Sequence, residues 1–337
     1  LQKLQELPDQ IEVAAREVAK LKLPSAWENV QEVVFCGMGG SAIGGEVAAT
    51  LPVGLRRKSV FVNREYELPA FIGPQTLVVV VSYSGETEEA LACFAEAKAL
   101  LAQRFVVTGG GPLAKLAHEQ GVPVYEFSYA APPRDAFGYL FAPLVHVLGL
   151  AGVLESAEVE LGATVQTLRE YIAKLSPNIP TEQNLAKSLA YAAFERLPLI
   201  VGSSFTLGVA KRWKNQINEH AKAAAFWDAF PESNHNTTEG FTYPQRFKDD
   251  VTVFLLAASA DHPEVGMRRS ILREYLRSVN IPVEEVHGEG VGLWAEKLTL
   301  LALGDFVSYY LALLYHVDPA PVPVITQLKA TLRSQAR

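Results

Sequence analysis

The segment that most constrains the fold of this chain is residues 77–89, with the sequence LVVVVSYSGETEE. Five consecutive apolar residues, four of them β-branched, run directly into a turn that contains serine and glycine. Such a short apolar run is typical of a strand that is buried on both faces. The glutamates and the helically spaced apolar residues that come next predict a helix that begins directly after the turn. The segment therefore has the strand–turn–helix pattern of a parallel α/β sheet.

Three hydroxyl side chains surround the predicted helix N-terminus, namely Ser82, Ser84 and Thr87. A helix N-terminus offers unpaired N–H groups and a partial positive charge, so it can hold a phosphate group. A single hydroxyl would be explained by capping of the helix alone. Three hydroxyls within six residues favour a site for a small anion.

A second glycine-rich turn, residues 37–45 with the sequence GMGGSAIGG, follows another predicted buried strand at Val33–Cys36. Its glycines would allow the backbone to approach a ligand closely. The same turn could bind a dinucleotide, with Glu65 holding a ribose, as in a nucleotide-dependent oxidoreductase. The strict GxGxxG spacing is not met, however, and the hydroxyl-rich turn would have no function in that alternative.

Strands and helices alternate in both halves of the chain, which predicts an α/β fold with two doubly wound parallel-sheet domains and flanking helices. We place the domains at residues 1–153 and residues 154–337, the second with a connector helix and the C-terminal helices. In the second half we expect one helix over residues 181–194, capped by Thr181, and one over residues 205–223. The serine-rich turn at residues 202–204 resembles residues 82–85, which indicates diverged duplicates.

The composition makes some classes of binding partner unfavourable. The 337 residues carry a net charge of −7, so nucleic acid and anionic membrane surfaces are unfavourable partners. No apolar run approaches the length of a membrane span. The two cysteines, Cys36 and Cys93, lie in apparent core segments and suggest no disulfide framework, which favours a reducing cytoplasm. No cluster of residues has the spacing of a metal site.

Three further positions carry side chains suited to chemistry. Arg134 follows two prolines, and a rigid Pro-Pro pair would aim it at a phosphate or an oxyanion. Glu219 lies towards the end of a polar helical segment at residues 211–222, much of which we interpret as a solvated face. His235 lies in a polar turn after Pro231. For Arg134 and His235, the residues alone leave a structural role as well supported as a functional one.

Taken together, the motifs resemble the bifunctional phosphoglucose/phosphomannose isomerases of the phosphoglucose isomerase superfamily, which is built from sugar-isomerase (SIS) domains. The resemblance covers nearly the whole chain in the right order. Its motifs are GMGGSAIGG at residues 37–45, SYSGET at 82–87, PPR at 132–134, NEHAK at 218–222, PESNHN at 231–236, LGDFVSYYLALL at 303–314 and the proline-rich tail that leads to Lys329.

The resemblance implies an aldose–ketose isomerase of glycolysis and gluconeogenesis. It would interconvert glucose 6-phosphate or mannose 6-phosphate with fructose 6-phosphate through a cis-enediol(ate), with no cofactor and no metal. A cytoplasmic homodimer with a shared active site is implied, since the superfamily takes its histidine from the neighbouring subunit. The alternative is a non-catalytic regulator of the SIS type, which would bind a phosphosugar without converting it.

The resemblance also implies roles for individual residues. Glu219 would be the base that moves a proton between C1 and C2, with Glu232 as the rival candidate. Arg134 would stabilise the enediolate, and His235 would serve ring opening. Lys329 would assist ring opening, although another basic residue of the tail such as Arg333 could do so instead. The sugar phosphate would be bound by Gly40, Ser41, Ser82, Ser84 and Thr87.

Two positions depart from the family pattern. Glu86 stands where the family commonly has asparagine, and this places a negative charge beside the proposed phosphate turn. If its side chain pointed inward, it would weaken phosphate binding. His220 stands where asparagine is more common, next to the proposed base, and it could disturb Glu219 or be mistaken for the ring-opening histidine.

Overall fold

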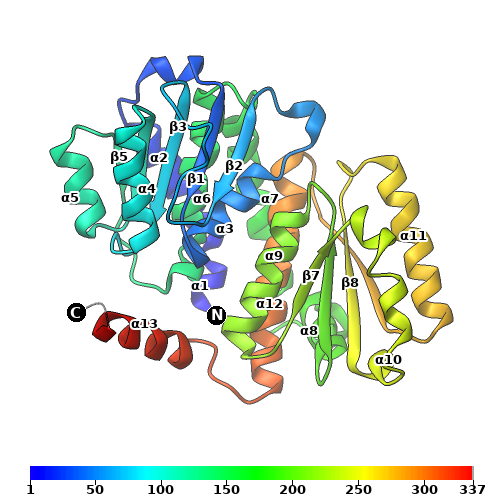
Figure 1. The fold of residues 1–337 in the computed structure, drawn as a ribbon. Coiled ribbons are helices and arrows are strands. Elements are labelled where there is room, and N and C mark those ends of the chain that lie inside the picture. The colour runs from blue at the N-terminus through cyan, green and yellow to red at the C-terminus, as the bar shows by residue number, and fades with distance from the viewer. Residues whose placement is uncertain (336–337) are drawn as a thin grey trace.

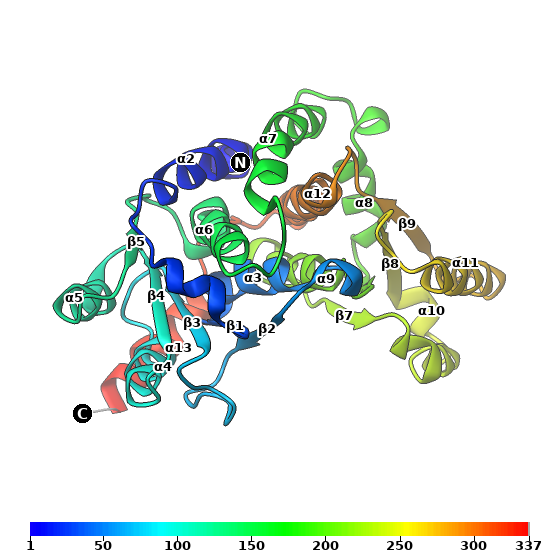
Figure 2. The same ribbon diagram turned by 90° about the horizontal axis from the view of Figure 1, so that it is seen from above.

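The computed structural model describes residues 1–335, with the side chains of Val53 and Arg333 excepted. Within this range the chain forms two separate parallel sheets joined by a layer of helices (Figures 1 and 2). The predicted α/β architecture is therefore confirmed. Helices pack on both faces of each sheet, and the two sheets share one hydrophobic core through the helices between them.

The first sheet has the strand order β2-β1-β3-β4-β5, and all of its pairings are parallel. The apolar run identified in the sequence is its central strand β3, and every residue of that strand is buried. The chain between β2 and β3 contains no helix, so the predicted alternation of strands and helices is wrong at this connection. The strands are β1 (Glu32–Cys36), β2 (Ser59–Asn63), β3 (Thr76–Ser82), β4 (Gln103–Thr108) and β5 (Val124–Glu126).

The second sheet has the order β7-β6-β8-β9 and is also parallel. This order repeats that of the first four strands of the first sheet. In each sheet the chain first adds a strand on one side and then returns to continue on the other side. This switch point lies between β1 and β3 in the first sheet and between β6 and β8 in the second. Ligands of doubly wound sheets bind at such switch points. The strands are β6 (Leu197–Gly202), β7 (Phe226–Ala229), β8 (Val251–Ala257) and β9 (Val283–His287).

The helices agree with the sequence prediction in order and type, and differ mainly at their ends. The predicted helix at 181–194 begins only at Leu185, because the Asn184 side chain caps it by accepting a hydrogen bond from the Lys187 N–H at 3.2 Å. Thr181 is therefore not the cap. The first helices are α1 (Gln2–Gln5), α2 (Leu7–Val18), α3 (Gly39–Ala49), α4 (Glu88–Ala99), α5 (Gly111–Glu119), α6 (Phe137–Leu150) and α7 (Ala157–Lys174). The remaining ones are α8 (Leu185–Ala193), α9 (Leu207–Gln216), α10 (Phe247–Asp250), α11 (Pro263–Ser278), α12 (Leu293–Leu314) and α13 (Pro323–Gln335).

Helices α3 and α9 join the two halves of the molecule. They pack with their backbones in close approach at Gly208, where an added Cβ would lie 2.8 Å from the Cα of Val47. Lys211 of α9 also forms an ion pair with Glu46 of α3, which is paired with Arg64 as well. These contacts hold the C-terminal part of α3 against the N-terminal half of α9.

Helix α12 is the long core helix of the protein. By length and composition alone it could cross a membrane, which the search for apolar runs in the sequence did not anticipate. In the folded chain, 83% of its most apolar window is buried against other parts of the protein. It packs against α7, α8 and α9. Its apolar character is therefore explained by burial in the protein core.

One buried side chain of α12, Lys297, contacts the C-terminal end of α3. Its Nζ donates hydrogen bonds to the carbonyl oxygens of Val47, at 3.0 Å, and of Thr50. It also lies over the ring of Phe205, 4.2 Å from the centroid. Burial lowers the pKa of this ammonium well below its ordinary value of 10.5. Lys297 thus connects the second half of the chain to the helix whose other end lies at the pocket described below.

This pKa shift predicts a pH-dependent stability. Between the lowered pKa of the folded state and 10.5, the unfolded chain binds more protons at Lys297 than the folded chain does. The wild type should therefore gain stability relative to Lys297→Met as the pH rises from neutral towards 10.5. Urea unfolding of both proteins across this range measures the difference. Parallel stability curves would contradict the shift.

Candidate active site

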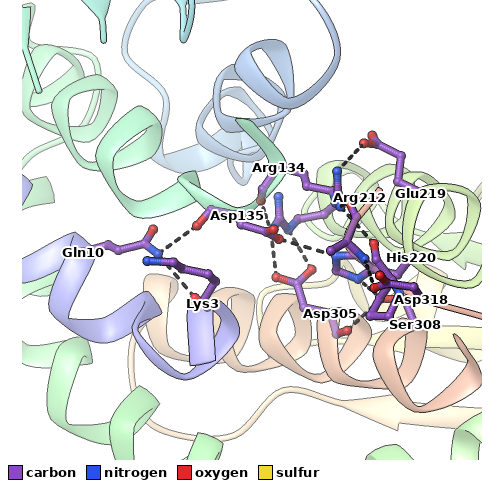
Figure 3. A network of polar contacts seen from close by, with 12 residues as sticks. Lys3, Gln10, Arg134, Asp135, Arg212, Glu219, His220, Asp305, Ser308 and Asp318 are labelled. Atoms are coloured by element: carbon purple, nitrogen blue, oxygen red, sulfur yellow. Dashed lines mark hydrogen bonds and ion pairs between the residues drawn. The ribbon is translucent and has the colours of Figure 1, made fainter. Parts of the chain in front are cut away.

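A narrow pocket opens where the N-terminus of α3 meets the end of α9, between the two sheets. Glycines of the first glycine-rich turn form one side of it, and a glutamate and an arginine predicted from the sequence face each other across it (Figure 3). The pocket is lined by Gly39, Gly40, Ile43, Arg134, Arg212, Asn215, Gln216 and Glu219. The structure therefore brings together side chains that are up to 180 positions apart in the sequence.

The turn that carries Arg134 rests directly on the first turn of α3. A Cβ added to Gly40 would lie 2.8 Å from the backbone nitrogen of Arg134 and 3.0 Å from the carbonyl carbon of Pro133. A side chain at position 40 would push the proline turn away. The glycine-rich sequence is needed here for close approach of two backbone segments, and this approach sets the position of Arg134.

Arg134 is buried, with 3% of its surface exposed. Its Nη2 donates hydrogen bonds to the carbonyl oxygens of Pro319, at 3.0 Å, and Ala320, at 2.7 Å, in the loop before α13. Its Nη1 lies 3.4 Å from Oε2 of Glu219. The Nε atom has no hydrogen-bond partner among the described residues. A buried guanidinium with a free N–H beside a pocket is well placed to bind an oxygen of a ligand.

Glu219 extends from a turn of π-helix, Ile217–Ala221, that continues α9. A π-helical turn widens the helix by one residue and is frequent at functional sites. The segment ends at Lys222, which adopts a left-handed conformation and donates from Nζ to the carbonyl oxygen of Glu219 at 2.5 Å. The Glu219 side chain keeps 25% of its surface exposed, so it is held in place while remaining accessible from the pocket.

A buried ion pair supports the pocket from below. Arg212 of α9 binds Asp305 of α12 in a bidentate arrangement, with distances of 2.9 Å and 2.7 Å, and also donates to the carbonyl oxygen of Arg134 at 3.1 Å. Burial raises the pKa of Asp305, and the charge of Arg212 opposes this rise. Figure 3 shows this pair beneath Arg134. The pair thus fixes the backbone of the arginine turn to helices of the second half.

The sequence analysis missed both members of this pair. The interpretation of residues 211–222 as a mostly solvated face is wrong for Arg212 and Trp213, which are buried. The signal that could have revealed the pair is Asp305, a carboxylate inside an otherwise apolar run of α12, because buried charges are nearly always paired.

His220 belongs to the same buried network. Its Nδ1 lies 2.9 Å from Ser308 Oγ, and its Nε2 lies 3.4 Å from Oδ1 of Asp135. Burial raises the pKa of Asp135, but the interaction with His220 and the charges of Arg134 and Arg212 together outweigh burial, so the net pKa is lowered. His220 therefore points away from the pocket and braces the residue next to Arg134. The structure gives no sign that it disturbs Glu219.

The two hydroxyl-bearing turns are in direct contact at the ends of β1 and β3. The Tyr83 N–H donates to Ser41 Oγ at 3.1 Å, which links the second turn to the first. Ser82 is fully buried, donates to Thr87 Oγ1 at 3.0 Å and accepts from the Gly85 N–H at 3.1 Å. Ser84 is exposed, and its Oγ accepts a hydrogen bond from the Glu86 N–H at 3.2 Å. These turns lie at the switch point of the first sheet, as the sequence predicts.

Glu86 is exposed, so its carboxylate is not buried against the turn at residues 82–85. Of the alternatives open at this position, the structure favours the one in which the side chain faces solvent at the start of α4. A negative charge there interacts favourably with the helix N-terminus.

Of the predicted site residues, only Gly40, Arg134 and Glu219 line the pocket in the single chain. The hydroxyl-bearing residues Ser41, Ser82, Ser84 and Thr87 do not line it, and three other candidates lie elsewhere on the surface. His235 is exposed in a short helical turn, Glu232–His235, that follows β7. Glu232, the rival base, is also exposed and accepts a hydrogen bond from the Asn236 side chain at 2.7 Å. Lys329 is exposed on α13, which extends below the first sheet in Figure 1. The side chain of Arg333 lies outside the described residues.

Comparison with known proteins places this arrangement in a family. Residues 182–332 match the family described as the bacterial phospho-glucose isomerase C-terminal SIS domain. A bifunctional phosphoglucose/phosphomannose isomerase from Caldicellulosiruptor bescii is 36% identical over 97% of this chain and 96% of its own length. A second protein of that name, from Aquifex aeolicus, is 32% identical over 92% of this chain and 95% of its own length. The chain belongs to the bifunctional phosphoglucose/phosphomannose isomerase family.

Solved structures share the fold of this family member at lower sequence identity. A hypothetical protein from Thermus thermophilus superposes with a TM-score of 0.77 and 17% identity, over 99% of this chain and 89% of that one. The tagatose-6-phosphate ketose/aldose isomerase from Escherichia coli has a TM-score of 0.68 and 14% identity, over 95% of each chain. At these identities the likeness concerns the fold alone. Membership of the isomerase family rests on the sequence relatives.

Proposed function

We propose that this chain is an aldose–ketose isomerase that interconverts glucose 6-phosphate and mannose 6-phosphate with fructose 6-phosphate. The observation that carries the proposal is the pairing of Glu219 and Arg134 across one pocket, at 3.4 Å, beside the glycine-rich N-terminus of α3. Isomerisation needs a base for a C–H next to a carbonyl and a fixed cation for the charge that develops. A regulator that only binds phosphosugars needs neither group.

The proposed reaction begins with the open-chain aldose. The Glu219 carboxylate removes the C2 proton, the electron pair forms the C1–C2 double bond, and negative charge develops on O1. The carboxyl group then returns the proton to C1 while a proton moves from O2 to O1, which leaves the ketose. Arg134 offers its Nε–H to the charged oxygen, because this donor has no partner among the described residues. Substrate binding would separate Glu219 from Arg134 and release the carboxylate to act as a base.

The sugar phosphate would lie beside the pocket, at the hydroxyl-bearing turns of the first sheet. Gly40 and Ser41 present the first turn of α3, and Ser82, Ser84 and Thr87 surround the N-terminus of α4. The contact between the Tyr83 N–H and Ser41 Oγ keeps the two turns together. Backbone N–H groups and hydroxyls suit a dianionic phosphate, since they supply several donors without a competing acid.

The activity can be tested with coupled assays on glucose 6-phosphate and on mannose 6-phosphate, each with and without a strong chelator. We expect turnover of both substrates and no loss with chelator, because the proposed chemistry uses only side chains of this protein. Absence of turnover, together with tight binding of fructose 6-phosphate, would favour the regulator instead. Dependence on added metal would contradict the proposed mechanism.

A homodimer would complete the site. β7 is an edge strand, and it exposes 56% of Phe226 and 42% of Trp227. Natural sheets seldom leave such an apolar edge uncovered. His235 lies in the exposed turn after this strand. A second copy packed on this edge would cover the aromatic rings and bring His235 of the partner subunit to the pocket for ring opening. Lys329 would reach the pocket only if α13 docked against it.

The shared site predicts complementation between two inactive variants. Glu219→Gln and His235→Ala should each be inactive alone. Mixing equal amounts under conditions of subunit exchange should restore about a quarter of wild-type activity, because half of the dimers are mixed and each mixed dimer has one intact site. Recovery is measured with the coupled assay after exchange. No recovery, with exchange verified by mass spectrometry of tagged subunits, would show that both residues act within one chain.

We further propose that the chain divides into domains at residues 1–153 and 154–337. This boundary falls between α6 and α7, and each sheet lies wholly on one side of it. We also place the enzyme in the cytoplasm. Both cysteines are buried free thiols, which suits a reducing compartment.

A further inference from the structure

Ligands of doubly wound sheets bind in the crevice beyond the carboxyl ends of the strands at the switch point, and the second sheet has a switch point that corresponds to that of the first. β6 and β8 occupy the places in their sheet that β1 and β3 occupy in the other, so both pairs flank a switch point. In the first sheet, Ser41 lies in the first turn of α3, which follows β1, and Ser82 is the last residue of β3. In the second sheet, the corresponding turns are residues 203–206, which lead into α9, and residues 258–262, which lead into α11.

A carboxylate of the chain itself fills the second crevice. The side chain of Asp261 is 3% exposed, and its Oδ1 accepts a hydrogen bond from Ser203 Oγ. Its Oδ2 accepts from the Ala258 N–H at 3.1 Å and from Nη1 of Arg269 at 2.5 Å. In the first crevice the buried hydroxyl of Ser82 instead meets Thr87 and the Gly85 N–H.

The groups around Asp261 are those that bind a small oxyanion. They consist of a buried hydroxyl, a backbone N–H that precedes a 16-residue helix, and a buried guanidinium. Phosphate and sulfate are recognised by the same combination of donors. Arg269 would remain in place without Asp261, because its Nε also donates to Glu285 at 3.2 Å, and Glu285 is held in turn by Arg273 at 2.5 Å.

We propose that the second switch-point crevice is an oxyanion site that Asp261 keeps closed by acting as a permanent internal ligand. In the wild-type chain, the Asp261 carboxylate therefore occupies the place that an oxyanion would take. Removal of the Asp261 carboxylate would open the second crevice to inorganic phosphate or sulfate. This inference does not depend on the isomerase activity, since it concerns a crevice that the proposed reaction does not use.

Calorimetric titration of inorganic phosphate into wild type and Asp261→Ala tests the proposal. We expect the variant to bind one more equivalent of phosphate per chain than the wild type, and sulfate to compete for it. Asp261→Asn is the matched control, because asparagine fills the same volume and should add no binding. Ser203→Ala in the Asp261→Ala background should weaken the added site by about tenfold, since a hydrogen bond to a charged group is lost.

Loss of the Asp261 carboxylate should also change the stability of the protein and its dependence on phosphate. Asp261→Ala should be less stable than wild type in chloride, and phosphate should raise its melting temperature more than it raises that of Asp261→Asn. If Asp261→Ala folds only when phosphate or sulfate is present, the proposal is supported. It is overturned if the variant gains no equivalent of phosphate, or if it remains unfolded in phosphate as well as in chloride.

Discussion

Replacing Glu219 with glutamine is expected to lower isomerase turnover by about 10²–10⁴-fold, the usual contribution of a general base. Glutamine has the same shape as glutamate but cannot accept the proton from the sugar carbon. The contact to Arg134 is long, at 3.4 Å, and partly exposed, so its loss should change stability little. Fructose 6-phosphate should still bind, because its phosphate would be held by the turns of the first sheet.

The matched control is Glu232→Gln, which changes the rival base in the same way. Glu232 is exposed and contacts Asn236, and it does not line the pocket. We expect this variant to keep near wild-type turnover. Steady-state assays with both aldose phosphates, together with calorimetric binding of fructose 6-phosphate, separate loss of chemistry from loss of binding. Full turnover by Glu219→Gln, or loss of turnover in Glu232→Gln alone, would reassign the base.

The largest effect on stability is expected from Asp305→Ala. This change leaves Arg212 as a buried charge without its bidentate partner, which typically costs about 3–5 kcal/mol in free energy of unfolding. The turn of Arg134 would also lose its support, because Arg212 donates to the carbonyl oxygen of that residue. Activity should therefore fall along with stability, as measured by urea unfolding and the coupled assay.

A double variant distinguishes the effect on the free energy of unfolding from the effect on the position of Arg134. Replacing both charges, as in Arg212→Met with Asp305→Leu, removes the unpaired charge and should recover most of the free energy of unfolding. Activity should remain low, because the carbonyl oxygen of Arg134 has still lost its donor. Recovery of activity together with stability would mean that the pair serves the core alone and does not position Arg134.

The sequence predicted the parts of the site that depend on local pattern. The run before Ser82 could be identified as a buried strand, because apolar continuity and the glycine turn that ends it are local properties. The N-terminus of α4 could be located for the same reason. These segments also carry the turns that we propose to bind the phosphate, since such turns follow directly from strand ends in a parallel sheet.

The residues that hold the site in place could not be predicted from local pattern. Arg212 and Asp305 lie 93 positions apart, and their pairing depends on how α9 and α12 pack. The π-helical turn at Glu219 is a deviation by one residue that apolar periodicity does not reveal. Thr181 and Asn184 are both good capping residues, and the choice between them depends on where the preceding loop places the chain. In each case tertiary packing decided what local pattern left open.

We propose that Glu219 moves a proton between C1 and C2 of the sugar within the pocket shared by α3 and α9. Solvent exchange tests it most directly, by NMR of fructose 6-phosphate incubated with enzyme in deuterated water. We predict that wild type incorporates deuterium at C1, and that Glu219→Gln binds the sugar phosphate without incorporating deuterium. Exchange by the variant at the wild-type rate would contradict the account.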